Sequence, residues 1–350
     1  MNFKRFWTMF KARNREFYRD RAGLGWNIIF PFLLVAGFGV IFGSEQRAEY
    51  KVGVFPSTIN SPEAGSLALP PRFLETRYVQ FVGFATQAQG LDKLAHHKID
   101  FLVAQGEAPY RYWISHDSPK GYFIEKIFRE ALLDDALLAA LARKEAISGD
   151  AIRYVDWLFP GIIGMNMMFS ALWGVGYVVV RYRKIGVLKR LNATPLTAFE
   201  YLSAQMVSRV GILMFSLAVV WLGCDLLFDF RVSGSYLNLV LMFLLGSLCL
   251  SALGLLLASR GISEEFTTGV LNFISWPMMF LSEVWFSLEG APDWVIRIAQ
   301  IFPLTHLLRG VRRVMHDGAG LAEVAPEVGI LAGMTLLFLI SGAALFSWNR

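Results

Sequence analysis

The residues that could carry chemistry in this sequence are few and stand far apart. Cys224 and Cys249 lie singly in apolar runs, without the spacing of a zinc site or a disulfide framework. His96 and His97 are adjacent, so on a helix they would point about 100° apart and would not form a ligand pair. The spacing supports no Ser-His-Asp or paired-carboxylate arrangement, and the phosphate-binding pattern G-x-x-x-x-G-K-S/T does not occur. We therefore expect no catalytic residue, no metal site and no cofactor bound by this chain, which would not be an enzyme on its own.

A second set of residues could act within a membrane. Glu283 lies near the end of a long apolar run, where an ionisable group is costly unless it faces water or a partner. It could contact a transported molecule, pair with Arg297 or Arg309, or lie solvated at the interface. Pro277 and Pro303 interrupt the apolar pattern on either side of Glu283. These three residues are candidates for a pathway or an outer gate.

The most informative stretch is a basic amphipathic segment, residues 181–204, between two long apolar runs. Ile185, Leu188 and Leu191 recur at a spacing of three, so we expect them to share one face of a helix. The other faces carry basic residues, namely Lys184, Lys189 and Arg190. The pattern predicts a short helix on the charged side of a membrane.

A break follows this helix at Asn192-Ala-Thr-Pro195. Proline lacks an N–H, and the residue before it avoids the helical region. A second helix is then expected, with Thr197 as its N-cap and Glu200 as the acidic partner of a capping box. Such a helix–break–helix is a rigid lever that a cytosolic partner could push.

The composition indicates an integral membrane protein. Of the 350 residues, 55% are hydrophobic and 17% are charged, against roughly 25% charged in soluble domains. The net charge of +5 fits cytoplasmic loops rich in Lys and Arg. No basic groove with stacking aromatic residues is visible, so nucleic acid is not an expected partner.

Apolar runs suited to crossing a bilayer, which takes about 20 residues, recur along the chain. We expect six transmembrane helices, within residues 22–43, 157–180, 206–228, 237–259, 266–286 and 328–348. The segment 290–310 is apolar but broken by a proline, and predicts outer half-inserted helices. The expected fold class is an α-helical integral membrane protein with a small α/β extracytoplasmic domain inserted between helices 1 and 2.

The two largest basic clusters agree with this topology. In residues 1–21, aromatic side chains at positions 3, 6, 7 and 10 alternate with Lys and Arg, which predicts an amphipathic helix on an anionic membrane face. The second cluster is 181–190. Six crossings and the positive-inside rule both place the two termini in the cytoplasm. The expected location is the bacterial inner membrane, with 156–350 carrying helices 2–6.

Residues 44–155 have ordinary polarity and predict the α/β domain. Asp117 or Ser118 could cap its last helix, with Pro119 in the first turn. The expected strands are 50–55, 77–86, 99–104 and 110–115, and the expected helices are 87–97 and 119 to about 147.

Three stretches, in this order, resemble the ABC-2 type permease family, the membrane subunits of one class of ABC exporter. They are YRKIGVLKRLNATPLTAFEYLSAQ (182–205), GLLLASRGISEEF (254–266) and WPMMFLSEVWFSLEGAPDWVIRIAQIFPLTHLLRGVR (276–312). The first resembles the basic, proline-containing loop that carries the family's coupling helix. The overall layout resembles the branch with a large extracytoplasmic domain. Glu283 departs from the pattern, since the family often has a small residue there.

The resemblance implies a partner that supplies the energy. Separate ATPase subunits would bind ATP and Mg and dock on the coupling helix of each of two permease copies, in a homodimer or heterodimer. An apolar face would fill a groove on the ATPase, and basic residues would steer the encounter. The implied coupling residues are Ile185, Leu188, Lys189, Arg190, Leu191, Pro195, Leu196 and Glu200.

Other functions stay open at this point. The substrate implied by analogy is a hydrophobic or amphipathic small molecule or a lipid-like compound, and a periplasmic adaptor protein is a conceivable partner. One alternative is a membrane-anchored sensor or assembly protein acting through the extracytoplasmic domain. Another is a secondary transporter, although repeated halves and midplane charges are not evident.

Overall fold

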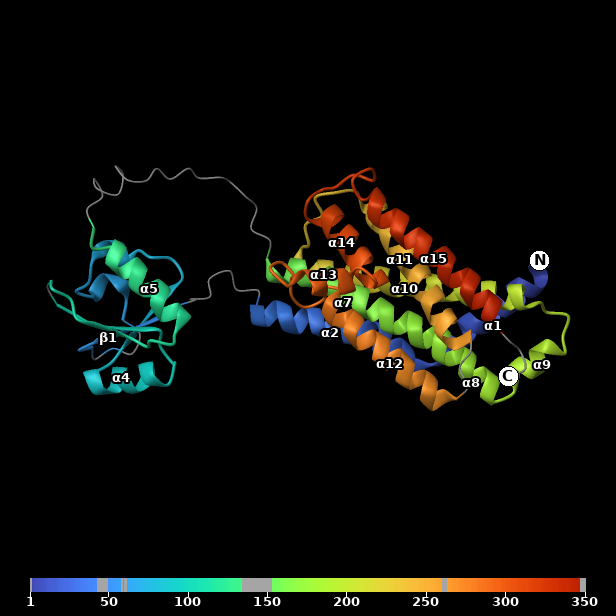
Figure 1. Ribbon diagram of the computed structural model, residues 1–350, viewed down its shortest axis with the longest axis horizontal. Helices are drawn as coiled ribbons and strands as arrows, with labels where there is room; N and C mark the ends of the chain where they lie inside the picture. The colour runs from blue at the N-terminus through green and yellow to red at the C-terminus, as the bar shows by residue number, and fades with distance from the viewer. Residues whose placement is uncertain are drawn as a thin grey trace. The chain divides into compact units, whose positions relative to one another are not determined.

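The computed structural model describes residues 2–42, 50–57, 59, 62–106, 108–133, 153–259 and 263–346. The chain divides into two compact units (Figure 1). We call residues 44–150 the α/β unit, and residues 1–43 with 151–350 the helical unit. Each is described by itself.

The α/β unit is built on a four-stranded sheet with the order β2-β1-β3-β4. Its first three strands are parallel, and β4 runs antiparallel to β3. The strands are β1 (Tyr50–Phe55), β2 (Val79–Gly83), β3 (Phe101–Ala104) and β4 (Tyr112–Ile114). All four predicted strands therefore form, although the last three are shorter than the sequence pattern suggested.

Short helices lie between these strands and after the last of them. They are η1 (Ala64–Ser66), α3 (Pro71–Leu74), α4 (Gln87–Ala95) and α5 (Pro119–Glu130). The predicted start of α5 is confirmed, because the Ser118 hydroxyl accepts the Gly121 N–H at 3.0 Å and Pro119 occupies the first turn. The helix ends at Glu130, and the part of the prediction beyond residue 133 lies outside the described residues.

Three aromatic side chains join the layers of this unit. Phe73 of α3, Phe101 of β3 and Phe128 of α5 are all completely buried. The Phe128 ring lies 4.9 Å from that of Phe73 and 5.3 Å from that of Phe101, centroid to centroid. Aromatic pairs at such distances add to the free energy of burial itself, so Phe128 holds α5 to both the sheet and α3.

Replacing Phe128 by Ala should therefore destabilise the α/β unit by about 3–5 kcal/mol, the usual cost of deleting a buried phenyl ring. The measurement is hydrogen exchange of residues 50–133 in the purified full-length protein. Phe123→Ala, on the same helix but 57% exposed, is the control and should change exchange little. Equal protection in the two variants would contradict this view of the core.

The helical unit contains one set of long helices and several short ones. The long helices are α2 (Arg21–Phe42), α7 (Tyr154–Ala171), α10 (Ala198–Phe228), α11 (Tyr236–Ser259), α12 (Glu264–Leu281) and α15 (Ala325–Leu345). The others are α1 (Phe3–Arg19), the π-helix η2 (Leu172–Tyr177), α8 (Val178–Lys184), α9 (Val187–Asn192), α13 (Asp293–Ala299) and α14 (Pro303–Met315). The long helices run broadly along one direction (Figure 1).

Five stretches of the described chain are long and apolar enough to cross a membrane. They are Arg21–Ile41, Tyr154–Lys184, Ala198–Phe228, Tyr236–Ser259 and Ala325–Leu345. They correspond to five of the six predicted crossings. The remaining prediction, 266–286, was wrong in its bounds, because α12 ends at Leu281 and Glu283 adopts a left-handed conformation with φ +59° that no helix continues through.

Close backbone packing brings the middle of the unit together. The stretches Tyr154–Lys184 and Tyr236–Ser259 are 67% buried, against 17% for the first and last crossing helices, so they form its centre. A side chain at Gly254 would lie 3.2 Å from the carbonyl oxygen of Ala171. Small residues permit this approach, as is usual for helices that pack in lipid.

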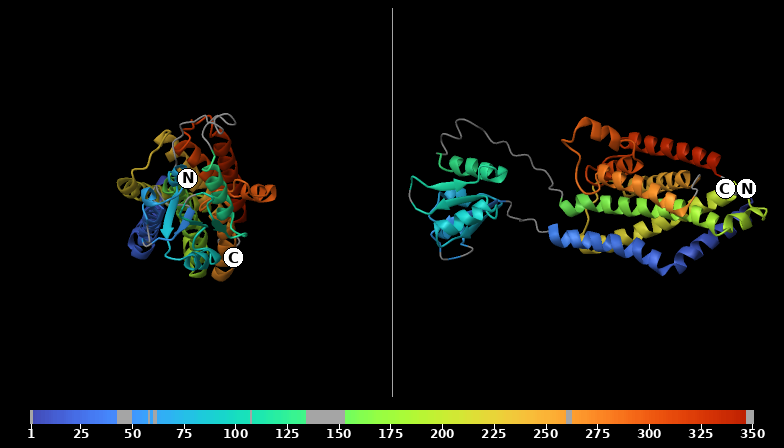
Figure 2. Two further views of the ribbon diagram at one scale, coloured as in Figure 1. Left: turned by 90° about the vertical axis from the view of Figure 1, so that its left-hand side faces the viewer. Right: turned by 60° about the horizontal axis from the view of Figure 1, so that its bottom comes forward.

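The N-terminal helix turns sharply into the first crossing helix at Asp20 (Figure 2). The Asp20 carboxylate accepts the Gly23 N–H at 2.9 Å, and the Asn2 side chain caps the start of α1. Phe3 and Trp7, on the predicted apolar stripe, are 68% and 42% exposed. Another face of α1 packs along the beginning of α10, a contact that the sequence did not predict.

Candidate functional site

The short helix that was predicted to carry Ile185, Leu188 and Leu191 on one face is interrupted at Gly186. Helix α8 ends at Lys184, Gly186 adopts φ +73°, and α9 starts at Val187. Glycine is the residue that takes this left-handed conformation readily. Ile185 caps α8 and is therefore not on the same helix as Leu188 and Leu191, which corrects the expected shared face.

Leu188 is completely buried and faces the protein itself. It belongs to a cluster of side chains from α8, α10, α11 and α15, which includes Val179, Tyr201 and Ala258. The expectation that Leu188 offers a contact surface does not fit this burial. Its position is that of an anchor, which fixes α9 against the ends of the crossing helices.

The other implied coupling residues lie at different depths. Lys189, Arg190 and Pro195 are exposed, whereas Leu191 and Leu196 are half-buried. Ile185 is 54% exposed. The surface of α9 and the following turn is therefore basic, with leucine side chains between the charges and the protein.

The predicted capping box at the start of α10 is confirmed. The Thr197 hydroxyl accepts the Glu200 N–H at 3.2 Å, and the Glu200 carboxylate accepts the Thr197 N–H at 3.1 Å. The other carboxylate oxygen of Glu200 accepts the backbone N–H of Asn2 at 2.5 Å. Glu200 is 2% exposed, so it joins the beginnings of α1 and α10 and is not itself a surface contact.

Helix α1 forms one wall of a pocket beside this turn. The guanidinium of Arg5 donates to the carbonyl oxygen of Pro195, which brings the helix to the turn. The pocket measures about 490 Å³. It is lined by Lys4, Arg5, Thr8, Met9 and Ala12 on one side and by Leu191, Thr194, Pro195 and Leu196 on the other. A partner that inserts a side chain here would touch both α1 and the turn after α9.

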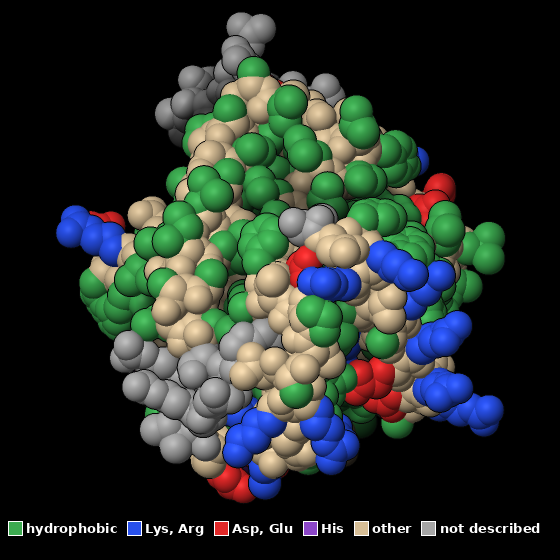
Figure 3. All heavy atoms as spheres, turned by 90° about the vertical axis from the view of Figure 1, so that its right-hand side faces the viewer, with side chains coloured by type: hydrophobic (Ala, Val, Ile, Leu, Met, Phe, Trp, Pro, Cys, Tyr) green, Lys and Arg blue, Asp and Glu red, His purple; other side chains and the backbone are tan. Residues whose placement is uncertain are grey.

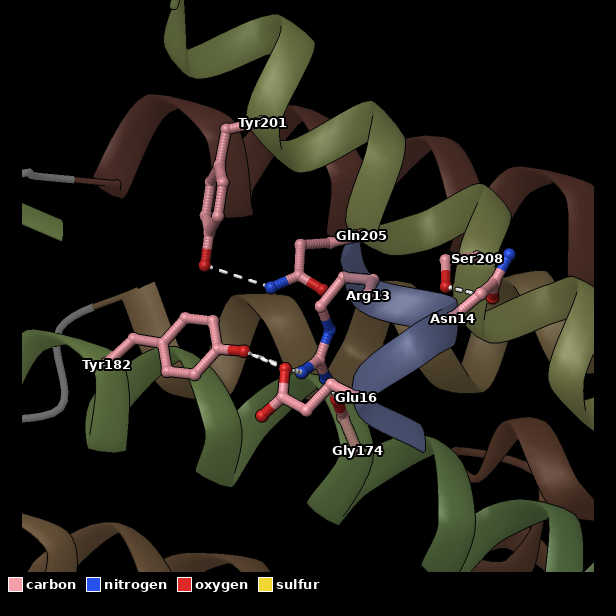
Figure 4. Close-up of polar contacts among 8 residues, drawn as sticks. All are labelled: Arg13, Asn14, Glu16, Gly174, Tyr182, Tyr201, Gln205 and Ser208. Carbon is pink, nitrogen blue, oxygen red and sulfur yellow. Dashed lines mark hydrogen bonds and ion pairs between the residues drawn. The ribbon is translucent and has the colours of Figure 1, made fainter. Parts of the chain in front are cut away.

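A polar network connects α1 to the second crossing (Figure 4). Arg13 pairs with Glu16 at 2.6 Å and donates to the Tyr182 hydroxyl at 2.9 Å. Its other terminal nitrogen donates to the carbonyl oxygen of Gly174, inside η2, at 3.1 Å. On the α10 side, Ser208 donates to Asn14 at 2.7 Å. Helix α1 is therefore held on two sides, and a π-helix supplies one of the contacts, as at many functional sites.

This end of the helical unit is strongly basic. Lys and Arg side chains gather over the lower and right parts of the face in Figure 3, while its upper part is largely apolar. Lys184 also pairs with Glu264 of α12 at 2.8 Å. We call this face, which carries α1, α8 and α9, the basic end.

At the opposite end of the crossing helices, Glu283 pairs with Arg312 of α14. The carboxylate lies 3.6 Å from the guanidinium, which also donates to the Glu283 carbonyl oxygen at 2.6 Å and stacks 3.9 Å from the Trp157 ring. Of the alternatives left open for Glu283, pairing with Arg297 or Arg309 is not what the structure has, since Arg309 is exposed and Arg297 lies on the separate helix α13. Nothing in the residue spacing favours Arg312 over the other two arginines.

The surroundings of Arg312 are closely packed. Burial lowers the pKa of Arg312 to about 10, while the charge of Glu283 acts in the opposite direction. Pro303 begins α14 and Pro277 lies inside α12. Their proposed part in a gate stays a prediction.

The class of protein now follows from these features. The chain is a multi-pass membrane protein with an irregular basic segment between two crossings and a polar cluster at the other end. The sequence model described as "ABC-2 family transporter protein" matches residues 21–344. The chain therefore belongs to the ABC-2 family, and it is a membrane permease component of an ABC transporter.

Curated relatives agree with this assignment. The chain is 23% identical over 197 residues to a daunorubicin resistance ABC transporter permease protein, DrrB1, of Streptomyces coeruleorubidus, which covers 55% of this chain and 69% of the relative. It is 26% identical over 176 residues to a putative transport permease, YvfS, of Bacillus subtilis, covering 50% and 70%. A third relative, ABC transporter G family member 20 of Dictyostelium discoideum, is 24% identical over 55% of this chain and 27% of its own length.

Replacing Glu200 by Ala should loosen α1, because two backbone N–H groups lose their acceptor. Losing a helix cap costs about 1 kcal/mol, and the α1 contact adds to this. Hydrogen exchange of residues 2–8 should become faster. Glu289→Ala, which removes an exposed carboxylate that accepts no hydrogen bond from the described residues, is the control. Unchanged exchange in the Glu200 variant would show that α1 does not depend on this carboxylate.

Replacing Arg312 by Met should lower stability by about 2–5 kcal/mol, the combined cost of a charge-assisted hydrogen bond and a cation–π contact. The measurement is thermal unfolding in detergent. Arg309→Met, three residues away on the exposed side of α14, should change the midpoint little. Similar shifts for the two variants would mean that the Trp157–Glu283 environment contributes nothing specific.

Proposed function

We propose that this chain is the permease subunit of an ATP-driven exporter, driven by a separate ATPase that docks at its basic end. The observation that carries the proposal is the 490 Å³ pocket between α1 and the turn after α9. Membership of the family implies ATPase subunits as partners. ATP and Mg would be bound by that partner, and this chain would transmit the motion.

The chemistry of the docking surface favours a partner with an apolar projection and an acidic rim. Leu191 and Leu196 line the pocket, and Lys4 and Arg5 stand at its edge. Lys189 and Arg190 extend from the neighbouring surface of α9. Apolar contact at the centre would supply affinity, while the basic rim would speed and orient the encounter.

The position of α9 suits the transmission of a push. It lies between α8 and α10 in the chain, and Leu188 belongs to the same buried cluster as Val179 of α8 and Tyr201 of α10. Close-packed side chains transmit a displacement because they have no space in which to absorb it. A movement of α9 would therefore reach two crossing helices together, and α1 would move with them through Glu200 and Arg13.

We propose that helix α12 also crosses the membrane, which brings the number of crossings to six and makes α12 the fifth along the chain. Its first residue, Glu264, pairs with Lys184 at the last residue of the second crossing. The residues after its end contact the start of that crossing, where the Tyr154 hydroxyl donates to the Trp285 carbonyl oxygen at 3.0 Å. Its 18 residues extend about 27 Å, close to the roughly 30 Å of the hydrocarbon core.

Six crossings support a topology with both ends of the chain on the side of the basic end. Tyr201, at the start of α10, lies near both Asn2, through Glu200, and Phe346, whose ring centroid is 6.2 Å away. The positive-inside rule makes this side the cytoplasm. The α/β unit would then lie outside, in a bacterial inner membrane, and a second permease copy would complete the pathway.

The substrate is proposed by analogy as a hydrophobic or amphipathic small molecule or a lipid-like compound. One relative carries daunorubicin resistance in its name, which supports efflux as the direction. A periplasmic adaptor remains part of the proposal. The family match weighs against the sensor and secondary-transporter alternatives.

Replacing Leu196 by Asp should reduce the amount of co-purified ATPase about tenfold or more, because a charge would be buried in the apolar contact. The measurement is the ratio of the two subunits after affinity purification of the co-expressed complex. Leu196→Met conserves volume and apolarity and should keep the wild-type ratio.

Comparing Leu188→Asp with Leu196→Asp separates a loss of ATPase docking from a loss of permease folding. Because Leu188 is an internal anchor, this variant should lower the yield of folded permease, whereas Leu196→Asp should not. If Leu196→Asp retains stoichiometric ATPase, the docking surface lies elsewhere.

A further inference from the structure

A second pocket at the basic end holds a buried positive charge that the coupling role does not use. It measures about 270 Å³ and lies between α1, the start of α2, η2 with α8, and α10. Its charged lining residues are Arg13, Glu16, Asp20, Arg181 and Arg209. Of the residues drawn in Figure 4, Arg13, Glu16, Gly174, Gln205 and Ser208 line it.

Arg209 is the residue that points to a ligand. It is 8% exposed, and no carboxylate of the described residues lies within ion-pair distance. One terminal nitrogen donates to the carbonyl oxygen of Ser170 and, at 2.6 Å, to its hydroxyl. Its Nε atom is buried and has no hydrogen-bond partner. A buried, unpaired charge of this kind is costly unless an opposite charge joins it.

The backbone is shaped to leave space for this guanidinium. A Cβ at Gly174 would overlap the guanidinium carbon of Arg209, so the glycine lets this guanidinium lie directly against η2 in its present position. The acids nearby are already engaged, since Glu16 pairs with Arg13 and Asp20 caps the start of α2. Arg181 is exposed and forms no ion pair with a described residue. The unsatisfied charge of the pocket is therefore positive.

The depth of Arg209 matches a lipid phosphate. Arg209 precedes Phe228, the last residue of α10, by 19 positions, which is about 29 Å along a helix. The hydrocarbon core is about 30 Å thick. If the far end of α10 lies at one membrane interface, Arg209 lies at the other, where phospholipid phosphates begin. The volume is just below the roughly 300–1,000 Å³ of drug-sized sites, so it suits a head group better than a whole amphipathic molecule.

We propose that this pocket binds the phosphate of an anionic phospholipid from the leaflet at the basic end. Arg209 would hold the phosphate inside the protein, Arg181 would attract it at the mouth, and the bound head group would brace α1 against α10. Basic pockets between crossing helices on the cytoplasmic side are suited to such head groups. Only the choice of the cytoplasmic leaflet rests on the proposed function, and the lipid assay below needs no ATPase.

The test is thermal unfolding of the purified full-length protein in detergent with added phosphatidylglycerol or phosphatidylcholine, together with native mass spectrometry of bound lipid. Phosphatidylglycerol should stabilise the wild-type protein more than phosphatidylcholine does. Arg209→Gln should bind phosphatidylglycerol about tenfold more weakly, as expected for the loss of one charge-assisted hydrogen bond. Arg209→Lys should retain part of the preference.

Arg15→Gln is the matched control, since it removes one exposed charge from α1 outside the pocket and should keep the lipid preference. If Arg209→Gln does not fold, Arg181→Gln at the mouth should still weaken the preference several-fold. Equal stabilisation by the two lipids, or equal losses in Arg15→Gln and Arg209→Gln, would overturn the proposal. Stabilisation by millimolar inorganic phosphate as strong as that by phosphatidylglycerol would overturn the lipid assignment.

Discussion

The carboxylate of Glu200 is the interaction on which the basic end of this protein depends. One oxygen completes the capping box of α10 and the other accepts the N–H of Asn2, the N-cap of α1, so a single side chain satisfies donors at two helix starts. Backbone donors at helix ends need such partners when water is excluded. Because α10 is a crossing helix and α1 is not, this carboxylate couples the surface of the protein to its membrane-crossing part.

The opposite ends of the bundle are joined in different ways. At the basic end, α1, α8, α10 and α12 are connected by several polar contacts around an apolar cluster. At the other end, Arg312 gathers Glu283 and Trp157, and the Tyr154 hydroxyl donates to the Trp285 carbonyl oxygen. Between them the helices pack through glycine and apolar side chains. Hydrogen bonds and ion pairs therefore lie at the two ends of the bundle, where a movement of the helices would begin and end. The apolar region between them is closely packed and can shift as one body.

Features that depend on residues close together in the sequence were predicted correctly. The caps at Thr197 and Ser118, the four strands and five of the crossings follow from spacing and residue type. The helical face of Ile185, Leu188 and Leu191 failed because periodicity cannot show that Gly186 turns the chain. The α1 wall of the pocket beside the turn after α9 and the pairing of Glu283 with Arg312 were missed because they join residues far apart in sequence, whose encounter is decided by packing.

The burial of Leu188 changes how a coupling segment should work here. An exposed apolar stripe would bind a partner but would leave α9 free to swing on the Gly186 turn. With Leu188 fixed beneath it, α9 has little freedom of its own, and the leucines that remain accessible are those facing α1. Binding would then engage α1 and α9 at once, and a force on either would pass through Glu200 and Leu188 into α8 and α10. The same burial explains why the surface of α9 can carry so many charges. The buried contact of Leu188 holds the segment in place. Lys189 and Arg190 therefore need only keep α9 solvated and attract a partner.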